Sequence, residues 1–299
     1  MSEKEKVWRC QGCGDVLQVP PEISDEELTE LEENDELLCA NCKFKGEKEE
    51  RRKEHDKTVF KGELKLVSTW DPLLKYAKRL LKEATFRVNG DTVTLREMND
   101  SRIAMLKAVL HREGLNDYVE EKQPDKVFRV DLATFTNAIR QAGYPVTVKS
   151  DGAFLHFEND WGSYRMPLIY EGYDETPPTP KLKYTAHTTL DINEIFEKLT
   201  WLHQKPEGVT LIAKDGKLRI KLGNGVGENL EAELGEAEGE AQASYSWEYL
   251  KIIKERYSGE KWDIEFGTEL PLHAQKINRL GERDSLKLDF YLAPRIEAY

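Results

Sequence analysis

All four cysteines of the chain lie in two Cys-x-x-Cys pairs near its beginning, Cys10 with Cys13 and Cys39 with Cys42. Each pair can place two thiolates in one tight turn, and four thiolates match the softness and tetrahedral geometry that Zn²⁺ prefers. Because four cysteines leave no open position for water or substrate, we expect one structural zinc ion. Disulfide bonds or thiol redox chemistry are the alternatives, but an intracellular chain keeps its thiols reduced and no thioredoxin-like pattern surrounds either pair. The sequence therefore predicts an N-terminal zinc ribbon.

A charged segment separates this predicted ribbon from the rest of the chain. Residues 43–57 are dense in charges of both signs and have almost no large apolar side chain, which is typical of a solvated helix or linker. We therefore place a domain boundary near residue 58. The length of 299 residues leaves room for about two further domains of ordinary size, and an apolar content of 39% can give them cores.

After this boundary the same order of elements occurs twice. Residues 71–84 have apolar side chains at helical spacing and lead into two alternating strands around the Asn89-Gly90 turn. Residues 192–203 are likewise amphipathic and lead into a hairpin on the Asp215-Gly216 turn. Two copies of one pattern predict a tandem duplication of an α+β unit, with helices on one face of an antiparallel sheet in each copy.

The second half of each copy repeats a helix followed by strands, with predicted helices at residues 131–142 and 245–257. Between the copies, three prolines close together prevent a helix and predict an extended connector. The predicted organisation is a zinc ribbon and charged linker at 1–58, one α+β domain at 59–169, the connector at 170–184 and a second α+β domain at 185–299.

Composition and motifs exclude several classes of protein. A net charge of −12 argues against a surface coated with nucleic-acid-binding side chains, although it does not exclude a local basic face. No apolar run approaches the ~20 residues of a membrane span, and the charged N-terminus lacks the apolar stretch of a signal peptide, so we expect a soluble, cytoplasmic protein. The six histidines have no metal-ligand spacing, and no phosphate loop or nucleophile motif is present. We therefore expect no enzymatic activity.

Several segments resemble the DNA sliding clamps of the proliferating cell nuclear antigen (PCNA) type, in an archaeal-like form. The C-terminal segment Leu288–Glu297 is similar to the final strand and tail of that family. Further similar segments, in chain order, are Lys82–Phe86, Arg96–Ile103, His111–Tyr118, Met166–Leu168 and Phe266–Leu272. The resemblance covers about residues 60–299 and leaves the predicted ribbon outside. It implies two tandem clamp-type domains and a DNA polymerase processivity factor that tethers replication proteins to duplex DNA.

A sliding ring must contact phosphates without reading bases, so Lys and Arg are expected on the helices that line its hole. In the first predicted helix, Lys75, Lys78 and Lys82 share one face at spacing i, i+3, i+7. Solvated lysines on helices are common, which is the alternative reading. With the resemblance, the predicted DNA-contacting residues are Lys75, Lys78, Arg79, Lys82, Arg140, Lys198, Lys205, Lys251, Lys254 and Arg256.

The resemblance also implies a pocket that binds short peptides from a DNA polymerase and other replication proteins. Its expected residues are Met98, Met105, Pro271, Tyr291, Ala293 and Pro294, with Leu182 from the connector. The alternative is that these side chains are core or strand-end residues. The family connector usually brings apolar side chains to the pocket wall, whereas this one offers Thr-Pro-Pro-Thr-Pro with Leu182 as its clear aliphatic residue.

Rings of this family close by strand pairing between subunits. By resemblance, the two edges would lie near 163–168 and 229–234, with Ser163 and Arg165 facing Glu231 and Glu233. Several unpaired carboxylates on one edge oppose pairing, so we expect a weak homotrimer, a mixed ring or a monomer. A monomeric clamp-fold adaptor that binds a replication or transcription protein through its ribbon and pocket is the alternative function.

Overall fold

The computed structural model separates the chain into two units, Met1–Thr58 and Val59–Tyr299. It describes residues 60, 62–66, 68–89, 92–111, 126–159, 162–170, 176–202, 206–223, 229–255, 259–280 and 283–295, all within the second unit. The predicted zinc ligands Cys10, Cys13, Cys39 and Cys42 lie outside these described residues, as do Lys205 and Arg256.

The first half of the second unit is an α+β domain. Its described elements are β1 (Gly62–Leu66), α3 (Trp70–Leu80), β2 (Glu83–Asn89), β3 (Thr92–Met98), β4 (Ala104–His111), β5 (Lys126–Asp131), α4 (Leu132–Ala142), β6 (Val146–Ser150), β7 (Phe154–Asn159) and β8 (Gly162–Pro167).

The second half has a similar order of elements after the connector. They are β9 (Ala186–Asp191), α5 (Asn193–Leu199), β10 (Gly208–Lys214), β11 (Lys217–Gly223), β12 (Asn229–Glu236), β13 (Glu238–Gly239), β14 (Ala241–Ser246), α6 (Trp247–Leu250), the 3₁₀ turn η2 (Lys251–Ile253), β15 (Lys261–Phe266), β16 (Leu272–Leu280) and β17 (Arg283–Leu292).

Helix α4 follows directly from its sequence. The Asp131 side chain accepts a hydrogen bond from the Thr134 backbone N–H at 2.7 Å, which caps the first turn. Gly143 ends the helix with φ of 75°, a conformation that favours glycine. Leu132, Phe135 and Ile139 form the buried stripe between these two ends.

Three predicted helices are too long, and the one at 192–203 is helical from Asn193 to Leu199. Helix α3 ends at Leu80 and not at residue 84, because Glu83–Asn89 pairs with both β3 and β5. Lys82 therefore lies between the helix and β2, and the prediction that it belongs to the helix was wrong. The predicted helix at 245–257 is also wrong: Tyr245 belongs to β14 and pairs with Val209, and α6 with η2 covers only residues 247–253. Strand pairing overrides the helical periodicity at the end of α3 and at 245–257.

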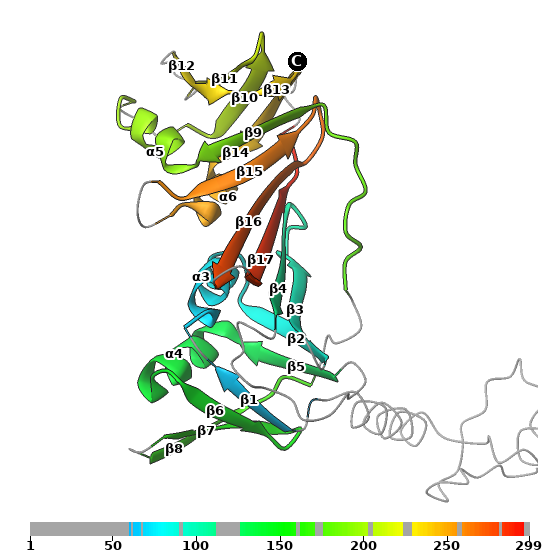
Figure 1. The fold of residues 1–299 in the computed structure, drawn as a ribbon, viewed down its shortest axis with the longest axis vertical. Helices are drawn as coiled ribbons and strands as arrows, with labels where there is room; N and C mark the ends of the chain where they lie inside the picture. Colours follow the sequence, from blue (N-terminus) through cyan, green and yellow to red (C-terminus); the bar gives the residue numbers. More distant parts are fainter. Residues whose placement is uncertain are drawn as a thin grey trace, which may run out of the picture. The chain divides into compact units, whose positions relative to one another are not determined.

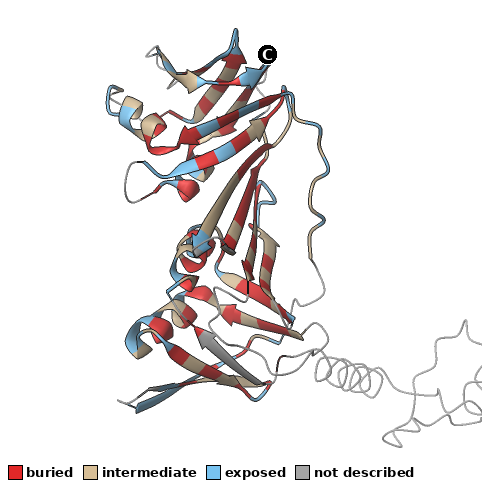
Figure 2. Ribbon diagram, viewed as in Figure 1, coloured by how far each residue is buried: buried red, intermediate tan, exposed pale blue. Residues whose placement is uncertain are grey.

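A nine-stranded antiparallel sheet runs through both halves, in the order β13-β9-β15-β16-β17-β4-β3-β2-β5. The halves join where β17 pairs with β4, from Leu286 opposite Leu110 to Leu292 opposite Ala104. Figure 1 shows α3, α4, α5 and α6 on one side of this sheet, which we call the helix face, and the connector on the other, which we call the connector face. Figure 2 shows buried residues along the strands and on the sheet-facing sides of the helices.

Two smaller sheets complete the second unit. They have the orders β1-β6-β7-β8 and β12-β11-β10-β14, so β8 and β12 are edge strands. Figure 1 shows these two strands at opposite ends of the described unit. None of the described helices is long and apolar enough to cross a membrane.

Candidate DNA face and partner surface

The helix face carries exposed cations from both halves of the sheet. Lys78, Arg140 and Lys254 are exposed on or beside α3, α4 and η2, and Lys82 is exposed after α3. Lys198 on α5 is half-buried, with its ammonium 5.9 Å from the ring centroid of Trp201. The duplicated helices therefore bring cations that are far apart in sequence to the same side of the sheet.

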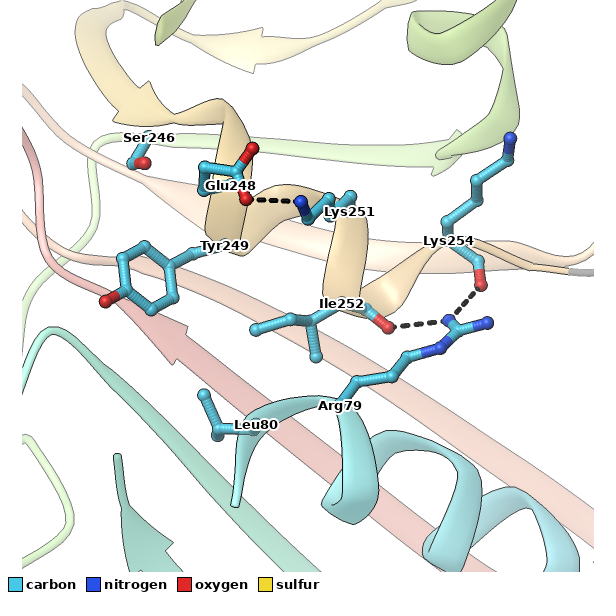
Figure 3. Close-up of a pocket in the computed structure, with 8 residues that line it drawn as sticks. All are labelled: Arg79, Leu80, Ser246, Glu248, Tyr249, Lys251, Ile252 and Lys254. Atoms are coloured by element: carbon cyan, nitrogen blue, oxygen red, sulfur yellow. Dashed lines mark hydrogen bonds and ion pairs between the residues drawn. The ribbon is translucent and has the colours of Figure 1, made fainter. Parts of the chain in front are cut away.

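Three of the predicted cations already have partners within the protein. The Lys75 Nζ lies 2.6 Å from Oε2 of Glu255, which is 5% exposed. Arg79 donates from NH1 to the carbonyl oxygens of Ile252 at 2.9 Å and Lys254 at 2.7 Å, as Figure 3 shows. Lys251 forms an ion pair with Glu248 one turn earlier. Helical spacing alone could not predict that these three cations have partners within the protein while Lys78 is exposed.

Glu255 is the centre of a buried polar cluster that holds α3 to the second half. Besides Lys75, it accepts hydrogen bonds from the Tyr76 hydroxyl, from Trp262 Nε1 at 3.2 Å and from Lys276 Nζ at 2.6 Å. Burial alone would raise the pKa of Glu255, but the hydrogen bonds from Lys276, Lys75 and Tyr76 outweigh it and hold that pKa below its ordinary value. The cluster therefore keeps a charged carboxylate at the junction of the two halves.

A groove of about 810 Å³ lies beside this junction, between α3 and residues 246–254 (Figure 3). Leu80 and Ile252 give it apolar walls, and Arg79 and Lys254 give it positive charge. The Tyr249 hydroxyl, also in its lining, accepts a hydrogen bond from Asn99 Nδ2 at 3.1 Å. The Asn99 Oδ1 in turn accepts hydrogen bonds from backbone N–H groups at the start of β4. The side chains of Tyr249 and Asn99 therefore link the groove to the turn between β3 and β4.

Three of the expected peptide-pocket residues lie side by side on the sheet. Strand register puts Met98 opposite Met105, and Met105 opposite Tyr291, so the three share a face of β3, β4 and β17. Met105 and Tyr291 are buried, whereas Pro271, Ala293 and Pro294 at the strand ends are half-buried, as is Leu182 in the connector. The buried pair packs in the sheet, whereas the others keep accessible surface, so the peptide pocket stays a prediction.

Sequence reasoning missed His273 of β16, which lies beside this surface. Its ring stacks on Tyr291 with centroids 4.6 Å apart, and Tyr184 of the connector stacks over it at 6.1 Å. Its Nδ1 lies 2.8 Å from Glu265 Oε2, and its Nε2 lies 2.9 Å from Asp289 Oδ1. Because an ionised carboxylate can only accept a hydrogen bond, a carboxylate at each nitrogen favours the doubly protonated, cationic ring.

The pKa of His273 follows from these contacts. Burial would lower the pKa, but the hydrogen bonds to Asp289 and Glu265 outweigh burial and raise the pKa above its ordinary value. The sequence alone could not predict this cluster, because Glu265, His273 and Asp289 belong to three strands. Only the register of the sheet brings them together.

The two edge strands carry the predicted interface residues. Ser163 and Arg165 are exposed on β8, with the Arg165 guanidinium 4.8 Å from the centroid of Phe154. Glu231 and Glu233 are exposed on β12, but the expectation that their charges lack partners was wrong for Glu233, whose Oε1 is 2.7 Å from Lys217 Nζ. Strand β11 also places Lys221 opposite Glu231, so cations of the same sheet offset this acidic edge.

We predict that the hydrogen bonds of His273 stabilise the fold in a pH-dependent manner. Because the folded pKa is raised above the ordinary value of about 6.5, the contribution is fully present below that pH and is lost as pH rises through the folded pKa. The free energy of unfolding of wild type should exceed that of His273→Gln by about 1–3 kcal/mol at pH 6, and by less at pH 9. Urea denaturation across this range measures the difference, and a difference independent of pH would contradict the prediction.

Comparisons with known proteins agree with this geometry. Residues 59–153 match the family described as proliferating cell nuclear antigen, N-terminal domain. A curated relative, the DNA polymerase sliding clamp of Thermococcus gammatolerans, is 26% identical over 243 residues, which cover 75% of this chain and 94% of the relative.

Solved structures that are similar to the chain include the following three. PCNA from Thermococcus kodakaraensis has a TM-score of 0.67 at 20% identity, covering 78% of this chain and 99% of that one. A. fulgidus PCNA bound to the C-terminal region of FEN-1 has a TM-score of 0.66 at 18% identity, with 80% and 100% covered. The PCNA2–PCNA3 complex from Sulfolobus tokodaii gives 0.63 at 18% identity, with 78% and 99% covered. Residues 59–299 therefore have the fold of a PCNA-type DNA sliding clamp.

Proposed function

We propose that this chain is a DNA sliding clamp: a non-enzymatic processivity factor that holds a DNA polymerase and other replication proteins on duplex DNA. The observation that carries the proposal is the helix face, where helices of both halves lie on one side of a continuous sheet and carry exposed cations. Such a surface meets phosphates, which repeat along any duplex, and therefore holds DNA without selecting a sequence.

The cations divide into two groups with different roles. Lys78, Lys82, Arg140 and Lys254 are exposed and are the principal phosphate contacts, together with Lys198. Lys75 and Arg79 hold the junction of the two halves through Glu255 and the η2 carbonyl oxygens, so their contribution to DNA binding is secondary. The charge of Lys251 is offset by Glu248, so Lys251 contributes less to DNA binding than an unpaired lysine would. Lys205 and Arg256 complete the proposed set from outside the described residues.

Assembly into a ring proceeds through the edges β8 and β12. A head-to-tail contact between edges at opposite ends of one molecule closes into a ring when the rotation between subunits permits it. Arg165 on β8 supplies a cation for Glu231 on β12, and Ser163 is small enough to lie against Glu233. Because Lys217 and Lys221 already neutralise part of β12, the proposed homotrimer is weak rather than forbidden.

A mixed ring with a second clamp is the related alternative, since the Sulfolobus tokodaii neighbour is a complex of PCNA2 with PCNA3. A monomeric adaptor that does not encircle DNA is the more distant one, and the acidic edge β12 favours it. Light scattering with and without duplex DNA separates the homotrimer from the two alternatives, because a chain that needs a second clamp and an adaptor both stay monomeric when alone.

Partner peptides would bind on the connector face near Met98, Met105, Tyr291, Ala293 and Pro294. The neighbour from A. fulgidus is bound to the C-terminal region of FEN-1, which supports a peptide partner here. Pro271 and Leu182 border the same area, and the stacked rings of Tyr184 and His273 replace the apolar contacts that the proline-rich connector lacks.

We further propose that Cys10, Cys13, Cys39 and Cys42 bind one structural zinc ion in a ribbon that recruits or orients a partner. The all-cysteine ligand set supports this assignment, because four thiolates satisfy zinc and leave it no catalytic position.

The zinc proposal predicts one zinc ion per freshly reduced chain by metal analysis. Replacing any one of the four cysteines with serine should release the metal and unfold the ribbon, while residues 60–299 keep their thermal transition. Freshly reduced wild-type protein without zinc would contradict the proposal.

The DNA proposal predicts that Lys78→Glu/Lys82→Glu weakens binding to duplex DNA of any sequence. Losing two phosphate contacts should reduce the slope of log affinity against log salt by about 2. Fluorescence anisotropy with two unrelated duplexes at several salt concentrations measures both effects.

The matched control is Lys181→Glu/Lys183→Glu, which makes the same charge change at exposed lysines of the connector. The control should bind DNA nearly as wild type does. Equal losses in the two variants would show that total charge, and not the helix face, determines binding.

The assembly proposal predicts a trimer that dissociates readily in the micromolar range. Glu231→Thr/Glu233→Thr should raise the trimer fraction, because threonine is neutral and β-branched, and Arg165→Glu should lower it. Sedimentation at low and high ionic strength measures these fractions. A stable wild-type trimer that neither change affects would overturn the role of this edge.

A further inference from the structure

The connector contacts two arginines on the connector face through threonine hydroxyls. Arg87 of β2 donates from NH2 to Thr176 Oγ1 at 2.6 Å, and Arg96 of β3 donates from NH1 to Thr179 Oγ1 at 3.3 Å. Register places Arg87 opposite Thr94, two residues before Arg96, so the two arginines share one face of the sheet. Two threonine hydroxyls of the connector therefore contact cationic side chains of the sheet.

Arg96 is the more informative of the two. Its Nε is buried and has no hydrogen-bond partner, and no described carboxylate lies within ion-pair distance of its guanidinium. Lys107 is directly opposite Arg96 on β4, with its ammonium 3.9 Å from Asp289 Oδ2. Two cations thus lie side by side on β3 and β4, and Arg96 retains an unused buried donor. A buried donor without an acceptor is unfavourable, so the site fits an additional anion.

The connector presents a suitable acceptor for such an anion. Thr176 and Thr179 are each followed by proline, and residues 176–184 have no regular secondary structure. Proline keeps the segment extended, which is the form in which peptide segments enter the groove of a modifying enzyme. Thr179 is half-buried, so its hydroxyl is accessible once the connector lifts from the sheet.

We propose that Thr179 is a phosphorylation site and that Arg96, with Lys107, binds the resulting phosphate. A separate proline-directed protein kinase would supply the phosphoryl group from a nucleoside triphosphate. The Thr179 Oγ attacks the γ-phosphorus, the bond from that phosphorus to the bridging oxygen breaks, the nucleoside diphosphate leaves and the hydroxyl proton passes to a base of the kinase. The new dianion supplies three acceptor oxygens close to the unused Arg96 donor.

Binding of this phosphate would fix the connector against β3. A charge-assisted hydrogen bond replaces the 3.3 Å contact to a neutral hydroxyl, and such bonds are roughly twice as strong as neutral ones. Because Leu182 and Tyr184 follow on the same segment, phosphorylation would hold the connector side of the peptide surface in one position. The inference does not depend on DNA binding or on ring assembly, since all of its groups belong to one chain.

The first experiment treats the full-length chain with a proline-directed kinase and ATP and locates phosphate by mass spectrometry. Phosphate should enter Thr179, and Thr179→Val should remove it, whereas the matched variant Thr176→Val should retain it. Phosphate confined to Thr176, or absent from both threonines when a Thr-Pro control peptide is fully modified, would overturn the proposal.

The second experiment follows the ³¹P resonance of phosphothreonine 179 against pH in the full-length chain. Binding to Arg96 should lower the second phosphate pKa below its usual value of about 6, and Arg96→Gln should return it to that of a free phosphopeptide. Amide exchange of residues 181–185 should slow several-fold on phosphorylation in wild type and not in Arg96→Gln. A phosphate that titrates identically in both proteins would show that Arg96 does not bind it.

Discussion

The pairing of β17 with β4 is the contact on which the other features of the second unit depend. It joins a strand at the end of the chain to one in the first half, and so makes one sheet from two similar α+β halves. Because side chains alternate across a sheet, this single register fixes which residues lie on the helix face and which on the connector face. A slip by one residue between these strands would place Met105 and Tyr291 on opposite faces of the sheet and separate the cations of the two halves.

The Glu255 cluster adds an ionic contact at the same junction. Removing one partner of a buried ion pair is strongly unfavourable, typically by about 3–5 kcal/mol, because the remaining charge stays buried. Lys75 and Lys276 approach Glu255 from different halves, so both halves must be in place before the carboxylate is compensated. Two cations of the helix face, Lys75 and Arg79, thus contribute to rigidity, which leaves the proposed phosphate contacts to their exposed neighbours.

The sequence predicted elements whose ends have their own chemistry, and it failed where distant pairing decided the outcome. Asp131 and Gly143 mark both ends of α4, and Asp215-Gly216 marks a hairpin, so their bounds could be read directly. Tyr245 reads as helical by periodicity but lies in β14 because Val209 is its strand partner. The cationic residues of the helices could be identified, but their partners could not, since Glu255 is far from Lys75 in sequence. The His273 stack was hidden for the same reason.

The charges on β12 influence which strand can pair with this edge. Glu231 and Glu233 are exposed on one side of this strand, while Leu230, Ala232 and Leu234 pack against the core on the other. An exposed edge with apolar residues on one side invites non-specific pairing, and charges on the other side discourage it. Because Lys217 pairs with Glu233 and Lys221 lies opposite Glu231, the net negative charge of this edge is reduced. Strand β8 offers a cationic partner through Arg165, whereas a second copy of β12 would bring glutamates together. In the proposed ring, this edge would therefore disfavour the symmetric contact between two copies of β12 more strongly than the head-to-tail contact with β8.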